Sequence, residues 1–562
     1  MRAASEYDVV VVGAGPGGSA AALTLVRKGA RVLLVEKSAS PGEANVSGGV
    51  LYGDFTKGYG LIDLVPSFEF EAPLERKVLS HEINILSKPD DRERTYHHYR
   101  LDGNSALARL GLFTVEIQTG HDYSVTRSQF DRWLADKAVA SGAEMMTSTS
   151  VKGLLTERGA GEDAEPEVVG VQTSKGDVRS KVVIDSAGVT STLVDEAGLR
   201  GPLGPRQLYH AVKRVYALPE DEIDRRFKVR KGEGRAISCF GDFLHGVAGN
   251  AFLFTNRETV SVGVVAALDS MVRAFTERFD EVGNMRDLLD GFVGHPYAAG
   301  LLEGAELLES SAHNVPRGHT AMLKTPYASG YLPTGDALGA FIKLGPLLDG
   351  MRRAIASGIM AAKAYLLASE SGSFKASNLS RYKEMLAPLY EDVNRAGRES
   401  FFGESGFAYS TLPRLLFSSS VFSKRVKFEP LPQRGPPAPA PPADGPSALI
   451  TVDTEAASKS SVKPWVPTCP AGCFSLATPR GSFASYKELY EANFKAIAAS
   501  PENKSGADVL AYRETLAQVS EGRLEFDGAA CIGCGTCAEI GPKETVRLEP
   551  GEGGKGSRFR YG

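Results

Sequence analysis

The residues most able to do chemistry are three cysteines near the end of the chain, in the segment CIGCGTC (531–537). Cys531, Cys534 and Cys537 are separated by two residues each, and the glycines between them permit a tight loop that turns the three thiolates toward one centre. A cubane iron–sulfur cluster needs four ligands. The spacing therefore predicts a cluster-binding loop that is completed by a cysteine from another part of the chain.

The fourth ligand is expected in VPTCPAGCFSL (466–476), which contains two candidates, Cys469 and Cys473. Ferredoxin-type clusters take one ligand from a Cys-Pro step remote from the C-x-x-C-x-x-C run, because proline turns the chain away from the cluster. We therefore predict that Cys469 is the ligand and that Cys473 is a small buried core residue. Cys239 has no cysteine near it in the sequence and is expected to be a core residue as well.

A zinc site is the alternative interpretation of the same cysteines. Zinc ribbons generally use two paired C-x-x-C knuckles, whereas this chain has one C-x-x-C-x-x-C triplet and a remote Cys-Pro step. That arrangement favours a single [4Fe–4S] cluster. Thr536 lies inside the triplet, where its hydroxyl could donate to a sulfur atom and raise the reduction potential of the cluster. The predicted cluster ligands are Cys469, Cys531, Cys534 and Cys537.

The start of the chain carries the pattern of a second cofactor, YDVVVVGAGPGGSAAALTLVRKGARVLLVEK (7–37). It predicts a buried strand, a glycine-rich turn, a helix whose first N–H groups face phosphate, and a second strand. Glu36 ends the second strand, at the distance where a carboxylate binds the ribose hydroxyls of an adenosine, and Lys37 is the next predicted contact. The pattern predicts a Rossmann-type dinucleotide site. The glycines of its G-x-G-x-x-G motif are Gly13, Gly15 and Gly18.

Length and composition limit the class of protein. A chain of 562 residues is too long for one hydrophobic core and is expected to form several domains. The net charge of −4 gives no indication of nucleic-acid binding. Six cysteines are too few for a disulfide framework in a chain of this length, and their C-x-x-C clustering indicates metal binding in a reducing compartment. We expect neither a secretory signal nor a transmembrane helix, which leaves attachment to a membrane surface possible.

Three later segments resemble the flavoprotein group that contains geranylgeranyl reductases and aromatic hydroxylases. They are YSVTRSQFDRWLADKAVASGAEM (123–145), KVVIDSAGVTS (181–191) and YLPTGDALGAF (331–341). The resemblance implies that Arg127 lies over the cofactor and that Asp336, of the pair Gly335–Asp336, binds a ribityl chain. FAD is therefore the expected dinucleotide. The chain has no second G-x-G-x-x-G motif, which favours an electron donor other than NAD(P)H.

The helix after the Gly-Asp pair is expected in GPLLDGMRRAIASGIMAAKAYLL (345–367). Pro346 is suited to its first turn, because the missing N–H of proline is not needed there. The positive end of this helix would face the flavin ring and favour its reduced, anionic form.

Three segments of the middle region resemble electron-transfer flavoprotein:quinone oxidoreductases and their bacterial FixC relatives. They are EANVSGGVLYG (43–53), VKRVYALPEDEIDRRF (212–227) and GNAFLFTNRETVSVGVV (249–265). In that family, the first of these packs beside the flavin ring, and Gly48–Gly49 would let the backbone approach the cofactor closely. The third predicts a β-hairpin with a structural role.

The C-terminal region resembles the FixX ferredoxin partner of FixC, through CPAG at 469–472, the cysteine triplet and the tail. In FixX the first cysteine of CPAG is the cluster ligand, which agrees with Cys469. We predict a flavin- and quinone-binding part at 1–428, a proline-rich spacer at 429–448 and a ferredoxin-like [4Fe–4S] domain at 449–562. Two amphipathic helices are expected at 485–521, where the family has a shorter connection.

The resemblance implies both a fold and an activity. The fold is α/β plus α+β: a Rossmann-type FAD domain interleaved with a quinone domain of the geranylgeranyl reductase and hydroxylase type, followed by the ferredoxin-like domain. The activity is that of an electron-transferring-flavoprotein dehydrogenase. Electrons pass from a reduced flavoprotein heterodimer through [4Fe–4S] and FAD to ubiquinone or menaquinone, and no acid, base or nucleophile is required.

A quinone site requires contact with lipid, and we expect peripheral attachment at the cytoplasmic face of the cell membrane. The segment STLPRLLFSSSVFSKRVKF (410–428) interleaves apolar and basic residues, as a surface-lying segment does. The alternative is that this segment forms a terminal helix that covers the hydrophobic core of the flavin domain. Two other functions share the flavin pattern: reduction of isoprenoid chains, and quinone reduction within an electron-bifurcating flavoprotein complex.

Overall fold

A computed structural model of the chain describes residues 7–53, 55–101, 121–158, 165–344, 347–403, 415, 417, 424–429, 448–499, 505–542, 545–551, 553–555 and 557–562. None of the helices in these ranges has the length and apolar character needed to cross a bilayer. Residues 430–447 of the predicted spacer and most of the predicted surface segment at 410–428 lie outside the described residues.

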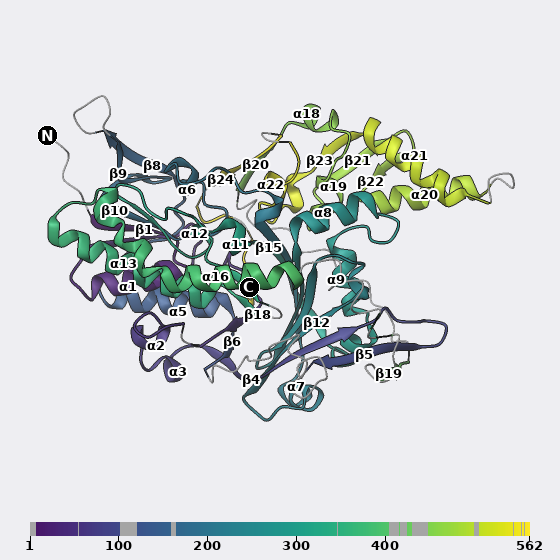
Figure 1. Cartoon of the computed structure of the whole chain (residues 1–562), viewed down its shortest axis with the longest axis horizontal. Helices are drawn as coiled ribbons and strands as arrows, with labels where there is room; N and C mark the ends of the chain where they lie inside the picture. Colours follow the sequence, from purple (N-terminus) through teal and green to yellow (C-terminus); the bar gives the residue numbers. More distant parts are fainter. Residues whose placement is uncertain are drawn as a thin grey trace.

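The first sheet forms the dinucleotide-binding part of the molecule (Figure 1). Its parallel strands, in spatial order, are β7 (Glu144–Met146), β2 (Val32–Val35), β1 (Tyr7–Val12), β10 (Gly176–Asp185) and β16 (Tyr331–Pro333). Its antiparallel extension is β9 (Pro166–Thr173) and β8 (Val151–Arg158). The valine run of β1 is buried on both faces, as expected for a central parallel strand.

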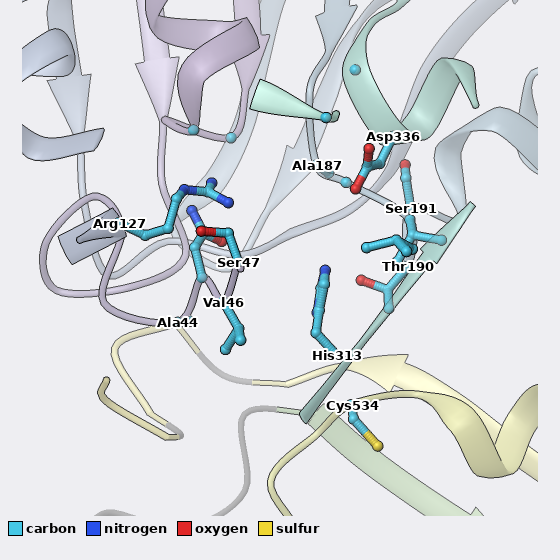
Figure 2. A pocket seen from close by; sticks show the side chains of 18 of the residues that line it. Ala44, Val46, Ser47, Arg127, Ala187, Thr190, Ser191, His313, Asp336 and Cys534 are labelled. Carbon is cyan, nitrogen blue, oxygen red and sulfur yellow. The ribbon is translucent and has the colours of Figure 1, made fainter. Parts of the chain in front are cut away.

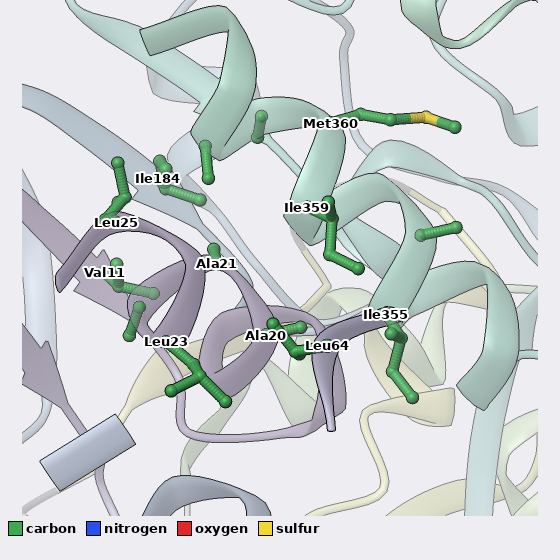
Figure 3. Packing of buried hydrophobic residues seen from close by; sticks show 14 of the residues in the cluster. Val11, Ala20, Ala21, Leu23, Leu25, Leu64, Ile184, Ile355, Ile359 and Met360 are labelled. Atoms are coloured by element: carbon green, nitrogen blue, oxygen red, sulfur yellow. The ribbon is translucent and has the colours of Figure 1, made fainter. Parts of the chain in front are cut away.

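Three helices cover one face of this sheet: α1 (Pro16–Val26), α5 (Arg127–Ala140) and α13 (Met351–Ser371). Figure 3 shows Ala20 and Ala21 of α1 facing Ile355 and Ile359 of α13, within one buried cluster. The two helices approach so closely that a Cβ atom on Gly358 would overlap the carbonyl oxygen of Gly17. This contact fixes the start of α1, where the glycine-rich turn ends.

The second sheet is mostly antiparallel and lies beside the first. Its strands, in spatial order, are β15 (Glu306–Pro316), β11 (Leu208–Ala217), β14 (Thr259–Ala267), β13 (Gly249–Thr255), β12 (Glu233–Gly241), β4 (Leu74–Leu86), β5 (Thr95–Leu101) and β19 (Lys424–Lys427). Two short strands, β3 (Val50–Leu51) and β6 (Tyr123–Val125), connect it to the segments around the glycine-rich turn. The predicted hairpin at 249–265 is confirmed as β13 and β14.

Short helices connect and cover the two sheets. They are α2 (Leu61–Leu64), α3 (Phe68–Glu71), α6 (Leu193–Glu196), α7 (Glu220–Phe227), α8 (Leu268–Glu277), α9 (Met285–Val293), α10 (Pro296–Leu301), α11 (Gly318–Ala321), α12 (Gly335–Leu338), α14 (Ala376–Leu379), α15 (Arg381–Met385) and α16 (Ala387–Gly403).

The C-terminal part forms two small sheets and five helices within the described residues. The strands are β20 (Ala448–Val452) paired with β24 (Val546–Pro550), and β21 (Phe474–Thr478) between β22 (Gly481–Phe483) and β23 (Arg523–Phe526). The helices are α18 (Thr454–Ser458), α19 (Trp465–Thr468), α20 (Tyr486–Ala498), α21 (Ala507–Glu521) and α22 (Thr536–Glu539). The two helices predicted at 485–521 are thus confirmed, and they lie beside α8 in Figure 1.

The predicted start of the long helix is wrong. β17 (Ile342–Leu344) pairs with β18 (Leu347–Asp349), and α13 begins only at Met351. Asp349 accepts hydrogen bonds from Arg352 and Arg353 in the first turn, so an acidic side chain stabilises the positive end of the helix. Pro346 lies outside the described residues.

Candidate functional site

A cavity of about 300 Å³ lies where the first sheet, the second sheet and the C-terminal part meet. Its wall contains the glycine-rich turn, the loop after β10, the start of α13 and the side chains of β11, β13 and β15. Figure 2 shows Arg127 on one side, Thr190, Ser191 and Asp336 on the other, and His313 and Cys534 below. The cavity therefore brings predicted flavin contacts and one predicted cluster ligand together.

The dinucleotide end of the cavity has the geometry that the motif predicts. Gly13 has φ +94°, a left-handed conformation that favours glycine, and a Cβ on Gly18 would overlap the carbonyl oxygen of Gly13. Gly15 lines the cavity with only Arg127 and Asn45 near its Cβ position, so its backbone is open to a ligand.

Glu36 lies at the end of β2 and is almost fully buried. Its carboxylate accepts the backbone N–H groups of Ala14 (2.9 Å) and Ser38 (2.8 Å), which fixes it at the cavity wall. The neighbouring Lys37 is exposed and also lines the cavity. Both residues therefore lie at the wall of the cavity.

The predicted ring end is formed by the segment 48–50 and the β13–β14 hairpin. A Cβ on Gly48 would lie 2.8 Å from the ring of Phe254, and Gly49 has φ +99°. Phe252 and Phe254 stack on each other at 4.8 Å and line the cavity. The hairpin, which the sequence assigns a structural role, thus also supplies the apolar wall of the site.

Arg127 is held at the cavity wall by a buried carboxylate. Its guanidinium donates to both oxygens of Asp131 at 2.7–3.0 Å, and Asn45 donates to the same carboxylate at 2.7 Å. Asp131 is fully buried and Arg127 is 13% exposed. Burial lowers the pKa of Arg127, but Asp131 more than compensates, so the pKa is raised and the side chain stays a cation.

Asp336 lies in the first turn of α12 with its side chain toward the cavity (Figure 2). Gly335 before it has φ +56° and donates its N–H to the hydroxyl of Ser357 at 2.9 Å. Burial raises the pKa of Asp336 to about 6, although the charge of Arg127 acts in the opposite direction.

We expect this raised pKa to be visible in the FAD-free protein. The folded state retains a proton on Asp336 up to about pH 6, whereas an unfolded aspartate loses it near its ordinary pKa of 3.8. The free energy of unfolding should therefore fall as the pH rises from about 4 through 6 and stay lower above that range. Thermal melting of wild type and Asp336→Asn at pH 5 and 7.5 tests this. The variant should gain stability relative to wild type at the higher pH, and an identical pH dependence would contradict the assignment.

The end of the chain, whose sequence resembles FixX termini that pack back toward the flavin domain, covers one side of the cavity. The backbone N–H of Gly554 donates to the carbonyl of Lys37 (2.7 Å), and that of Phe559 to the carbonyl of Glu43 (2.6 Å). The carboxylate of Glu309 accepts the N–H groups of residues 560 and 561 at 2.7 and 3.1 Å. Residues 553–555 and 557–562 therefore join the C-terminal part to the segment after β2 and to the second sheet.

The predicted cluster ligands line a second, smaller cavity in the C-terminal part. Its wall contains five cysteines, namely Cys469, Cys473, Cys531, Cys534 and Cys537. Among the described residues, no three His, Cys, Asp or Glu side chains are grouped so that they could hold a single metal ion. The donor set around the cavity still suits an iron–sulfur cluster, in which cysteine thiolates surround several metal atoms.

Backbone N–H groups point at two of these sulfur atoms. Cys473 donates its N–H to the Sγ of Cys469 at 3.3 Å, and Gly533 donates to the Sγ of Cys531 at 3.4 Å. Hydrogen bonds from the Cys473 thiol and from backbone N–H groups lower the pKa of Cys469 to about 7, although burial acts against them. Cys473 is 4% exposed, as predicted for a core residue, but it also forms part of the cavity wall. Cys239 is fully buried in the core of the second sheet.

The two cavities share part of their walls. Ile532 and Cys534 line both of them, so the cysteine loop contributes to the wall of the flavin cavity and to that of the cysteine cavity. The loop is anchored to the second sheet through Thr536, whose hydroxyl lies 3.0 Å from Nδ1 of His210 and 2.9 Å from Oδ1 of Asn314. Burial lowers the pKa of His210 to about 4, so the imidazole is neutral.

Comparisons with known proteins agree with this architecture. A family model described as FAD dependent oxidoreductase matches residues 8–205. Protein FixC of Bradyrhizobium diazoefficiens is 33% identical over 384 residues, which cover 68% of this chain and 80% of FixC. The chain belongs to the FixC family. FixC of Escherichia coli K12 is also 33% identical, over 68% of this chain and 81% of that protein.

Another relative of this FixC-family chain is the "probable electron transfer flavoprotein-quinone oxidoreductase YdiS" of Escherichia coli K12, with 31% identity over 73% of this chain and 89% of YdiS. A solved structure of a geranylgeranyl bacteriochlorophyll reductase-like protein from Thermoplasma acidophilum aligns with a TM-score of 0.54 and 22% identity, over 73% of this chain and 90% of that one. The predicted family, the FAD-dependent oxidoreductase class and the geranylgeranyl reductase-like fold of the flavin part are thereby confirmed.

Proposed function

We propose that this chain is an electron-transfer flavoprotein:quinone oxidoreductase, which takes electrons from a reduced electron-transfer flavoprotein and delivers them through a [4Fe–4S] cluster and FAD to a membrane quinone. Membership of the FixC family supports the flavoprotein part of this proposal. The common wall of the flavin cavity and the cysteine cavity, formed by Ile532 and Cys534, is the observation that carries it.

Four cysteines would hold the cluster. They are Cys469, Cys531, Cys534 and Cys537, with Cys473 behind Cys469 as a neighbouring thiol. When bound, the cluster carries single electrons and FAD carries one or two, which matches a one-electron donor to a quinone that needs two. Cys534 differs from the other three predicted ligands, because it lines both the cysteine cavity and the flavin cavity.

The flavin cavity would hold FAD in an extended form. The turn at Gly13, Gly15 and Gly18 offers backbone N–H groups to the pyrophosphate, and Glu36, beside Lys37, faces the adenosine ribose. Asp336 lies where a carboxylate can accept a hydrogen bond from the ribityl chain. Gly48, Gly49 and the phenylalanines of β13 enclose an apolar end that excludes water from the ring.

Quinone reduction would take place at a membrane surface. The described edge strand β19 is basic and exposed through Lys424, Arg425 and Lys427. Anionic headgroups on the cytoplasmic leaflet attract such residues. We therefore propose peripheral attachment at the cytoplasmic face through this strand.

The electron donor that reduces the protein distinguishes this function from that of a dehydrogenase that oxidises NADH without a partner. We expect NADH alone to reduce the purified protein slowly, because the chain has one dinucleotide motif and FAD occupies it. A reduced electron-transfer flavoprotein should reduce it quickly, and a short-chain quinone should then reoxidise it. Stopped-flow absorbance of the flavin measures both steps. Rapid reduction by NADH without a flavoprotein partner would contradict the proposal, and saturation of an isoprenoid chain would favour a prenyl reductase.

A further inference from the structure

Thr536 is the polar contact between the cysteine loop and the flavin part of the molecule. It is 1% exposed, and its hydroxyl faces His210 of β11 and Asn314 of β15, which lie opposite each other in the sheet. The same hydroxyl lies 3.4 Å from the Sγ of Cys534. One hydroxyl therefore touches a proposed cluster ligand and two buried side chains of the second sheet.

The direction of the hydrogen bonds follows from His210. Its Nδ1 lies 2.7 Å from Oδ1 of Asn314 and 3.0 Å from Oγ1 of Thr536, while its Nε2 is buried and has no partner among the described residues. An amide carbonyl oxygen only accepts, so Nδ1 carries the proton of the neutral imidazole. Asn314 accepts this N–H.

Thr536 has one hydroxyl proton and two acceptors for it. Oδ1 of Asn314 lies at 2.9 Å, and Sγ of Cys534 lies at 3.4 Å. A cluster-bound cysteine is a thiolate, which can only accept. The hydroxyl can donate fully to only one acceptor at a time, so a hydrogen bond to Asn314 weakens the hydrogen bond to the cysteine sulfur.

We propose that Asn314 lowers the reduction potential of the cluster by competing with Cys534 for the hydroxyl proton of Thr536. This inference rests on the proposed function, since it assumes a cluster at Cys534. Hydrogen bonds to the sulfur atoms of a cluster stabilise its reduced, more negative form and raise its potential. Asn314 is thus a positioning residue: it acts on the cluster through Thr536 and makes no contact with the cluster itself.

The leucine variant of Asn314 tests this inference. In Asn314→Leu, the Nδ1–H of His210 retains only Oγ1 of Thr536 as an acceptor, and this bond directs the threonine proton toward Cys534. The midpoint potential of the cluster, measured by redox titration with electron paramagnetic resonance, should shift upward. In the double variant Asn314→Leu/Thr536→Val the upward shift should be absent, whereas Asn314→Leu/Thr536→Ser should retain it.

The buried residue Asn250 of β13 provides the matched control, because it is 0% exposed and belongs to a different strand of the same sheet from His210 of β11 and Asn314 of β15. Asn250→Leu should leave the potential unchanged. An unchanged or lower potential in Asn314→Leu, with a normal cluster signal, would overturn the inference and leave the proposed function intact. An equal upward shift in the Thr536→Val background would overturn it as well. If the wild type carries no iron–sulfur signal, the proposed function fails and this inference fails with it.

Discussion

Replacing Cys469 by serine should leave the purified protein with less than about one iron atom per chain, against about four for an intact [4Fe–4S] cluster. Cys469 is the cysteine of the Cys-Pro step, and its sulfur lies in the same cavity as the cysteines of 531–537. A hydroxyl group is a poor substitute for a thiolate ligand. Because metal binding and local folding are linked in small metal sites, the C-terminal part should also lose thermal stability. Iron and sulfide analysis after anaerobic purification measures the first effect.

Cys473→Ser is the matched control for this experiment. The residue lies on the wall of the same cavity and contacts Cys469 both through its thiol and through its backbone N–H, which donates to the Sγ of Cys469 at 3.3 Å. The substitution keeps this N–H and replaces the thiol by a hydroxyl, which can also donate a hydrogen bond. The variant should therefore retain its iron and its resonance signal. Loss of iron in Cys473→Ser with retention in Cys469→Ser would reverse the assignment of the fourth ligand. Stoichiometric zinc in the wild type would contradict the cluster itself.

The sequence predicts structure most reliably where the chemistry of a site requires a fixed local order of elements. The glycine motif needs a strand, a turn and a helix in fixed order, and β1, the turn at Gly13 and α1 follow it. The alternating residues of 249–265 form the expected hairpin, because three polar residues, 256–258, separate two runs of strand-forming residues. The family resemblance then predicts the arrangement of the two large sheets.

Local sequence patterns do not predict contacts between residues that are far apart in the chain. Thr536 contacts His210 across 326 positions of the sequence. Glu309 accepts the N–H groups of Arg560 and Tyr561, which lie 251 and 252 positions further along the chain. Neither pair has a motif, since a single histidine or glutamate in a strand is compatible with many roles. The start of α13 is mispredicted for a different reason: β17 pairs with β18 as a local hairpin, which takes up residues 347–349 of the predicted helix.

Among substitutions around the flavin cavity, we expect Asp131→Ala to weaken FAD binding most, because Asp131 holds Arg127 at the cavity wall. Asp131 is 0% exposed and accepts two N–H groups of Arg127, so its removal leaves a buried guanidinium without its partner. Breaking such a buried pair costs about 3–5 kcal/mol of stability. Arg127 would also lose its fixed position at the cavity wall, and FAD should bind at least about tenfold more weakly, which corresponds to about 1.4 kcal/mol.

Asp136, five residues later on α5, is exposed and provides the control on the same helix. Urea denaturation followed by flavin fluorescence should show Asp136→Ala within about 0.5 kcal/mol of the wild type and Asp131→Ala releasing FAD at much lower urea. Asp131→Asn separates charge from shape, because the amide keeps the volume of the side chain but leaves the cation uncompensated. If both Asp131 variants release FAD at the same urea concentration as Asp136→Ala, then Asp131 does not hold Arg127 in place, and the ion pair seen at the cavity wall has no part in binding the cofactor.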